Sequence, residues 1–167
     1  MNRLLLTSDL HLGHRNAYKW RPRFSSPEEH DSIIYDKLAS SVGKRDTIYF
    51  LGDVAFTDGA LLKIQNLKVK HKVLILGNHD LERGMKLEKL LLVYDKIMAL
   101  YSKRNLWFSH CPIHPSEMRR RLGCVHGHTH ATVVDDPRYF NVCLEHTEYK
   151  PILFSAVMDE MLSRNLE

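Results

Sequence analysis

Five short motifs each place an aspartate, an asparagine or a histidine directly after an apolar run of the chain. In order, they are Asp9-Leu10-His11, Gly52-Asp53, Gly77-Asn78-His79-Asp80, His110-Cys111-Pro112 and Gly127-His128-Thr129-His130. Carboxylate oxygens, amide oxygens and imidazole nitrogens all bind divalent metal ions. Because short apolar runs indicate strands, the pattern predicts a metal site built at the ends of several strands.

The spacing within two motifs places a pair of side chains on the same side of the chain. Residues i and i+2 of an extended segment point to the same side of the backbone. Asp9 and His11 have this spacing, and so do His128 and His130. We therefore expect the carboxylate of Asp9 and the imidazole of His11 to reach one cation.

Two other motifs suggest a division of roles. The carboxylate of Asp53 has two oxygens and can bridge two ions. Neighbouring residues point in different directions, so Asn78 can offer its amide oxygen to a metal while His79 faces a substrate. With His110, the candidates number seven ligands for two ions.

Each motif alone also has a purely structural interpretation. An Asp-x-His triplet can lie on the surface, Gly-Asp is common in turns, and Asn-His-Asp can cap a following helix. All five motifs occur in order, each after an apolar run. This combination favours the metal site over the structural alternatives.

The five motifs together resemble the signature of the calcineurin-like metallophosphoesterase superfamily, and they span residues 9 to 130. The resemblance implies two ion positions that share one carboxylate. The first would be held by Asp9, His11, Asp53 and His130. The second would be held by Asp53, Asn78, His110 and His128. The resemblance also implies that His79, held by Asp80, acts on the leaving group and is not a ligand.

The segment Gly13-His14-Arg15-Asn16 and the tail around Asn141 and Lys150 resemble a branch of small bacterial and phage phosphoesterases without a cap domain. The implied activity is dinuclear metal-dependent hydrolysis of a phosphodiester, such as a cyclic or linear nucleotide, by attack of a metal-bridging hydroxide. The alternatives are a phosphomonoesterase or nucleotidase, a nuclease acting on short nucleic acid, and a non-catalytic interaction module on the same scaffold. Such a module is expected to have lost ligands, and here all are retained.

The expected cofactor is a pair of divalent ions bound by oxygen and imidazole ligands, with no cysteine among them. This ligand set suits Mn²⁺ first, with Fe²⁺, Zn²⁺, Co²⁺ or Ni²⁺ as alternatives. Cys111 stands where that branch would have an aromatic residue. We expect it to change the pocket wall without touching the ligands.

Substrate contacts are expected from residues beside the ligand motifs, namely His14, Arg15 and His114. Residues 15–24 interleave basic and aromatic side chains, which can hold phosphate and stack on a nucleobase. In the alternative, the aromatic side chains of this loop pack on the domain and its basic side chains are solvated. No motif accompanies His30, His71 and His146, which are expected to face solvent.

The length of 167 residues and the 44% hydrophobic content fit one domain over residues 1–167. The net charge of +4 is compatible with an anionic partner. The expected partner is a small phosphoester, because no additional domain grips long nucleic acid. Three cysteines without a CxxC motif predict no disulfide framework. No apolar stretch predicts a signal peptide or a membrane span, so a cytoplasmic location is expected, and the oligomeric state stays open.

The apolar periodicity predicts an α/β domain. Expected strands cover residues 4–7, 47–51, 73–76, 96–101, 105–109, 124–126, 139–142 and 152–154. Expected helices cover residues 27–42, 58–67, 85–92 and 156–163. The resemblance implies the calcineurin-like phosphoesterase fold, in which two mixed β-sheets pack face to face with helices on the outside (αββα layers).

Overall fold

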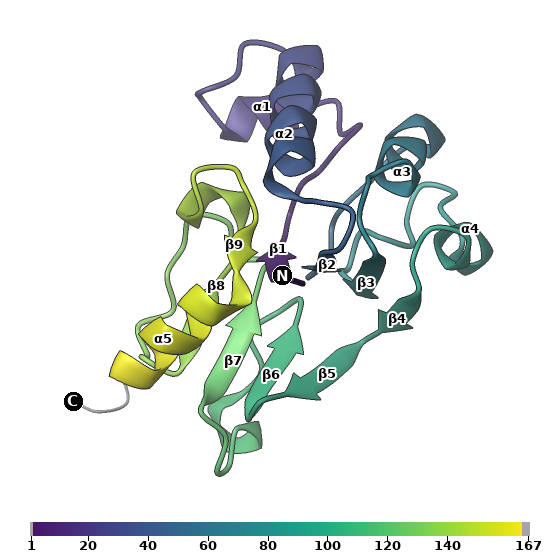
Figure 1. Cartoon of the computed structure of the whole chain (residues 1–167). Coiled ribbons are helices and arrows are strands. Elements are labelled where there is room, and N and C mark those ends of the chain that lie inside the picture. The colour runs from purple at the N-terminus through teal and green to yellow at the C-terminus, as the bar shows by residue number, and fades with distance from the viewer. Residues whose placement is uncertain (1, 165–167) are drawn as a thin grey trace.

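The computed structural model describes residues 2–164 and contains two mixed β-sheets, as predicted (Figure 1). The first sheet has the order β4-β3-β2-β1-β9. Its strands are β1 (Leu4–Thr7), β2 (Thr47–Phe50), β3 (His71–Ile75), β4 (Lys96–Met98) and β9 (Ile152–Leu153). The first four are parallel, and β9 runs antiparallel to β1.

The second sheet has the order β5-β6-β7-β8. Its strands are β5 (Leu100–Lys103), β6 (Leu106–Ser109), β7 (Gly123–His126) and β8 (Tyr139–Asn141). The strands β6, β7 and β8 are parallel, and β5 is antiparallel to β6. Each sheet therefore brings the carboxyl ends of parallel strands to one edge.

The helices are α1 (Ala17–Trp20), α2 (Pro27–Ser41), α3 (Asp58–Gln65), α4 (Leu87–Leu91) and α5 (Phe154–Arg164). Two short 3-10 helices, η1 (Pro115–Glu117) and η2 (Leu144–His146), lie between strands. The predicted start of α2 is confirmed, because the Ser26 hydroxyl accepts a hydrogen bond from the Glu29 N–H at 3.1 Å.

Side-chain alternation along the first sheet builds two apolar cores. Leu5 and Phe50 pack with Ile34 of α2 and other helix residues on one face. Leu6 and Tyr49, their neighbours in the strands, pack on the other face with residues of the second sheet. The first sheet is thus covered on both sides, as its continuous apolar strands predict, and the second core holds the two sheets face to face.

Three details differ from the sequence prediction. The predicted strand 96–101 is two strands, because the chain leaves the first sheet after β4 and enters the second at β5. Phe154 begins α5 and does not end β9. The outer face of the second sheet packs on Met118 after η1 and on neighbouring loop residues, and none of the α-helices within residues 2–164 contributes to this cluster.

Helix α5 lies beside β8 and β9 (Figure 1) and contributes Phe154, Val157 and Met161 to the core between the sheets. It therefore closes that core on the side where β9 and β8 are the edge strands. Within residues 2–164, none of the helices has the length and apolar character that a membrane crossing requires.

Candidate metal centre

The sheet edges gather the predicted ligands in one place. Asp9, Asp53 and Asn78 follow β1, β2 and β3 at the carboxyl edge of the first sheet, while His110 and His128 follow β6 and β7 of the second sheet. The two edges meet, since the backbone N–H of His128 donates a hydrogen bond to Asp9 Oδ2 at 2.8 Å. Ligands from both sheets therefore reach a common space.

The backbone at five predicted ligands is left-handed. The φ angles are positive at Asp9 (57°), His11 (52°), Asp53 (55°), His128 (68°) and His130 (48°). Such conformations cost free energy in non-glycine residues and cluster at functional sites. The prediction that Asp9 and His11 converge because their segment is extended is therefore wrong in its reason, since the chain turns at both residues.

Asp9 organises one half of the cluster, which we call the Asp9 half. Its Oδ1 lies 3.6 Å from His11 Nε2 and 3.9 Å from His130 Nε2. His11 Nε2 also lies 3.9 Å from Asp53 Oδ2. These atoms surround a space that a single cation can fill.

His110 organises the other half, which we call the His110 half. Its Nε2 lies 2.9 Å from Asn78 Oδ1, 3.2 Å from His128 Nδ1 and 3.4 Å from Asp53 Oδ2. Its Nδ1 donates to the Leu51 carbonyl at 2.7 Å, because a carbonyl oxygen only accepts. In the neutral ring, Nε2 then carries the lone pair and faces the cluster. The Asp53 carboxylate touches both halves, as the resemblance implies.

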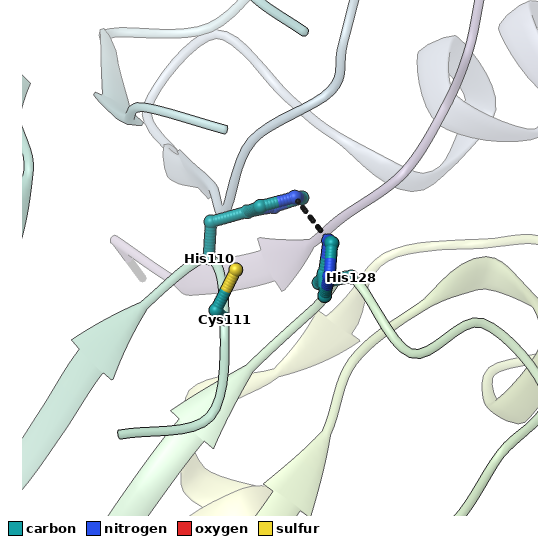
Figure 2. A group of neighbouring side chains, drawn as sticks. All are labelled: His110, Cys111 and His128. Atoms are coloured by element: carbon teal, nitrogen blue, oxygen red, sulfur yellow. Dashed lines mark hydrogen bonds between the residues drawn. The ribbon is translucent and has the colours of Figure 1, made fainter. Parts of the chain in front are cut away.

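The cluster contains buried polar atoms that a bound cation would satisfy. Asp9 Oδ1 and His11 Nε2 are buried side-chain atoms without a hydrogen-bond partner, and such atoms are costly unless something binds them. Atoms able to ligate a metal lie within 4.8 Å of one another in three groups from these motifs. The groups are Asp9 with His11 and His130, Asp9 with Asp53 and His110, and His110 with Cys111 and His128 (Figure 2). The donor set therefore fits divalent ions.

The surroundings of Asp9 favour its ionised carboxylate, which is the form that binds a metal ion. Burial raises the pKa of Asp9, but the nearby His11 and His110 rings and the hydrogen bond from Ser8 outweigh it and hold the pKa well below its usual range. Burial lowers the pKa of His11, which keeps its ring neutral and its lone pair available. For His110, the Asp53 and Asp9 carboxylates outweigh burial and raise the pKa to about 9.

The structure corrects the predicted pairing of His79 with Asp80. The Asp80 carboxylate is buried and accepts hydrogen bonds from the backbone N–H groups of Gly77 (2.7 Å), Val54 (3.0 Å) and Asp53 (3.1 Å). It thus shapes the loops that carry the ligands. The half-exposed ring of His79 instead pairs through Nδ1 with Glu82 Oε2 at 2.7 Å.

Two residues that sequence reasoning did not single out for the metal site support the Asp9 half. Glu145 Oε1 lies 3.0 Å from His130 Nδ1 and accepts from Arg21 Nε at 2.8 Å. Burial opposes its charge, but His130 and Arg21 lower its pKa to about 2. Arg21 also donates to the Asp9 carbonyl at 2.6 Å. A metal-bound histidine commonly has such a carboxylate, but no local pattern marks which one.

The predicted substrate residues have different surroundings. His14 is buried beside the cluster, with its ring 5.8 Å from that of His11. Arg15 is exposed. His114 is exposed, and its Nδ1 accepts from the Ser116 N–H at 3.2 Å, which caps η1. The structure therefore brings His14 to the site and gives His114 a local structural contact.

The loop 15–24 agrees with the structural alternative only in part. Phe24 packs in the core, and Arg21 is buried, contrary to the expectation of solvated basic side chains. Trp20 is 65% exposed. His30 is fully buried, so its predicted solvent exposure is wrong, because its Nε2 lies 2.9 Å from Arg21 Nη1.

A sequence model of the family described as calcineurin-like phosphoesterase matches residues 2–164. The chain belongs to this family. A metal-dependent phosphoesterase is therefore the class of enzyme that the family supports, in agreement with the predicted resemblance and fold.

Relatives of this family member include viral and archaeal proteins. The Gene 66 protein of Mycobacterium phage L5 is 31% identical, over 80% of this chain and 80% of the phage protein. The uncharacterized protein MJ1445 of Methanocaldococcus jannaschii is 27% identical, over 95% of this chain and 90% of that protein.

Two solved structures share the fold of this phosphoesterase. The protein of unknown function AQ665 from Aquifex aeolicus has a TM-score of 0.76 at 22% identity, over 95% of this chain and 99% of that chain. The nuclease MPE from Pseudomonas putida has a TM-score of 0.53 at 21% identity, over 77% and 62% of the two chains.

Proposed function

We propose that this protein is a dinuclear metal-dependent phosphodiesterase whose substrate is a small phosphoester, with a cyclic or linear nucleotide as the candidate. The observation that carries the proposal is the convergence of seven candidate metal ligands from two sheets around buried, unpartnered polar atoms. This arrangement occurs in a chain that belongs to a phosphoesterase family.

Both ion positions use ligands that the structure brings together. Asp9, His11, Asp53 and His130 would hold one ion, and Asp53, Asn78, His110 and His128 would hold the other. Bound divalent ions would supply positive charge to the phosphoryl oxygens and activate a water molecule. Mn²⁺ is the first ion to test, because oxygen and imidazole ligands suit it.

His79 is the proposed proton donor to the leaving group. Its side chain is 39% exposed, and its ring lies 6.3 Å from the ring of His11. Because Glu82 occupies Nδ1, the other ring nitrogen stays free for a substrate oxygen. A general acid in this position contributes about 10²-fold to 10⁴-fold to the rate.

A cavity of about 190 Å³ beside the Asp9 half favours a diester with an aromatic group. Its lining includes His11, Trp20 and His130. The exposed indole of Trp20 can stack on a nucleobase. This cavity next to the candidate ligands has room for the second group of a diester. It suits a nucleotide or the end of a short oligonucleotide.

The substrate preference is tested by measuring hydrolysis of bis-p-nitrophenyl phosphate and p-nitrophenyl phosphate by the Mn²⁺-loaded protein. We expect faster turnover of the diester, and faster turnover of the monoester would overturn the preference. With a cyclic nucleotide, Trp20→Ala should raise KM by about 5-fold to 150-fold, because stacking is worth about 1–3 kcal/mol. Cleavage of single-stranded oligonucleotides with salt-dependent binding would instead favour the nuclease alternative.

The catalytic assignment is tested by comparing His79→Ala with Asp53→Ala. We expect His79→Ala to lower kcat by about 10²-fold to 10⁴-fold without loss of bound metal, and Asp53→Ala to lose both activity and metal. His71→Ala is the matched control, since its exposed ring pairs only with the exposed Asp95. A parallel loss of metal and activity in His79→Ala would show that His79 is a ligand.

A further inference from the structure

The Cys111 thiol lies at the His110 half of the cluster. Its Sγ, one ring nitrogen of His110 and one of His128 all lie within 4.8 Å of one another. Figure 2 shows the thiol projecting toward the same region as the two imidazole rings. Cys111 is exposed, so an ion can reach this group from solvent.

We propose that Cys111 is a further ligand of the ion held by His110 and His128, which makes this half a sulfur-containing site for Zn²⁺ or Co²⁺. The proposal rests on the metal binding that is part of the proposed function. It replaces the expectation that Cys111 lines the pocket without touching the ligands.

The geometry suits a thiolate site. In tetrahedral coordination, Zn–N bonds of about 2.0–2.1 Å and Zn–S bonds of about 2.3 Å put ligand atoms roughly 3–4 Å apart. His110 Nε2 and His128 Nδ1 are 3.2 Å apart. Asn78 Oδ1 and Asp53 Oδ2 lie 2.9 Å and 3.4 Å from the same His110 nitrogen and supply oxygen donors. Cys111 thus adds a sulfur to the nitrogen and oxygen donors of the His110 half.

The adjoining Asp9 half also contains a buried nitrogen that a cation would satisfy. His11 Nε2 belongs to a side chain that is only 6% exposed, and it has no hydrogen-bond partner. It lies 3.9 Å from the Asp53 carboxylate oxygen that is 3.4 Å from His110 Nε2. The His110 half therefore adjoins a buried nitrogen that lacks a partner.

The other two thiols have different surroundings. Cys143 is fully buried and donates to Asp9 Oδ2 at 3.1 Å, so it acts as a hydrogen-bond donor to a ligand. Cys124 is fully buried in the small core on the outer face of the second sheet. Among the residues 2–164, only Cys111 places its sulfur in a group with two imidazoles.

Sulfur would change the preference of this half among metal ions. A thiolate is a soft ligand and favours Zn²⁺ and Co²⁺ over Mn²⁺. One sulfur–metal bond forms, and the thiol proton is released to solvent. The Asp9 half, with carboxylates and imidazoles alone, keeps the preference for Mn²⁺. The two positions would then bind different ions.

The test is a Co²⁺ titration of the metal-free protein followed by absorption spectroscopy. Visible d–d bands report Co²⁺ binding, and a near-ultraviolet charge-transfer band reports a thiolate ligand. We expect both in the native protein. Cys111→Ser should keep the visible bands and lose the charge-transfer band, while the control Cys124→Ala should keep both.

A charge-transfer band that survives in Cys111→Ser, or visible bands without a charge-transfer band in the native protein, would overturn the thiolate proposal and leave the phosphodiesterase proposal intact. Absence of any Co²⁺ or Mn²⁺ binding would overturn both proposals. As a second readout, Cys111→Ser should lower the ratio of Zn²⁺ to Mn²⁺ affinity at the His110 half by at least about tenfold, or about 1.4 kcal/mol. An unchanged ratio would count against the thiolate ligand.

Discussion

Asp9 shows how single residues prepare the site. Its Oδ2 accepts from the Ser8 hydroxyl (2.6 Å), the His128 N–H (2.8 Å) and the Cys143 thiol (3.1 Å). Its carbonyl accepts from Arg21. These bonds hold a residue whose left-handed backbone is otherwise unfavourable, and they leave Oδ1 as the free oxygen that faces His11 and His130.

Glu145 should matter in a similar way, because it fixes the ring of His130. Replacing Glu145 by Gln removes the charge that holds His130 Nδ1 and Arg21. We expect metal affinity to fall by about tenfold to a hundredfold, as for other carboxylates behind metal-bound histidines. Competition with a chelator measures this affinity.

Glu148→Gln is the matched control, since Glu148 is exposed and pairs with Lys150. Equal metal affinity in the two variants would show that Glu145 does not position His130. A loss in Glu145→Gln accompanied by a lower free energy of unfolding in the metal-free protein would indicate a structural effect instead.

At the scale of elements, glycines at strand ends let separate strands approach. A Cβ on Gly77 would overlap the carboxylate of Asp53, and a Cβ on Gly127 would overlap Ser8 Oγ and Asp9 Oδ2. The Gly-Asn-His and Gly-His motifs therefore contain glycine because the backbone after β3 and β7 packs directly on ligands of neighbouring strands.

Gly127→Ala should displace Asp9 and weaken metal binding at the Asp9 half. Forcing a methyl group into this packed space costs about 1–3 kcal/mol. Gly59→Ala in α3 is the control, because no atom lies within 4 Å of its added Cβ, and it should stabilise the protein by up to about 1 kcal/mol. Urea unfolding and metal titration of both variants test this, and normal metal binding in Gly127→Ala would contradict it.

At the scale of the whole molecule, acid stability depends on carboxylates that the fold pairs. Asp46 precedes β2, is buried, and accepts from the Arg3 N–H and the Arg3 guanidinium, both at 3.1 Å. The Arg3 hydrogen bonds outweigh desolvation and lower the pKa of Asp46 to about 2. This pair ties the start of the first strand to the loop before the second.

Because the folded pKa of Asp46 lies below its unfolded value of about 3.9, its contribution is complete above pH 4 and is lost as pH falls toward 2. We expect Asp46→Asn to lower the free energy of unfolding most near neutral pH and progressively less below pH 4. Urea unfolding from pH 2 to 7 measures the difference, with the exposed Asp159→Asn as control. A constant difference across this range would contradict the prediction.

The sequence by itself determined the strand ends and most of the ligand candidates. An apolar run that ends at an Asp, Asn or His indicates a buried strand followed by a polar residue. Both properties depend on neighbouring residues in the sequence. For this reason, the positions of Asp9, Asp53 and His110 after strands could be predicted without coordinates. The start of α2 at Ser26 was predictable for the same reason, since a helix cap acts over one turn.

Only the tertiary structure decided which local pieces meet. The run 96–101 is apolar after Lys96, and only packing divides it between two sheets. Glu145 reaches His130 and Arg21 through contacts between distant segments, and Cys111 joins His128 across neighbouring strands. Such contacts depend on how whole elements pack, and no local sequence pattern records this packing. The residues that support the metal site could therefore be identified only from the tertiary structure.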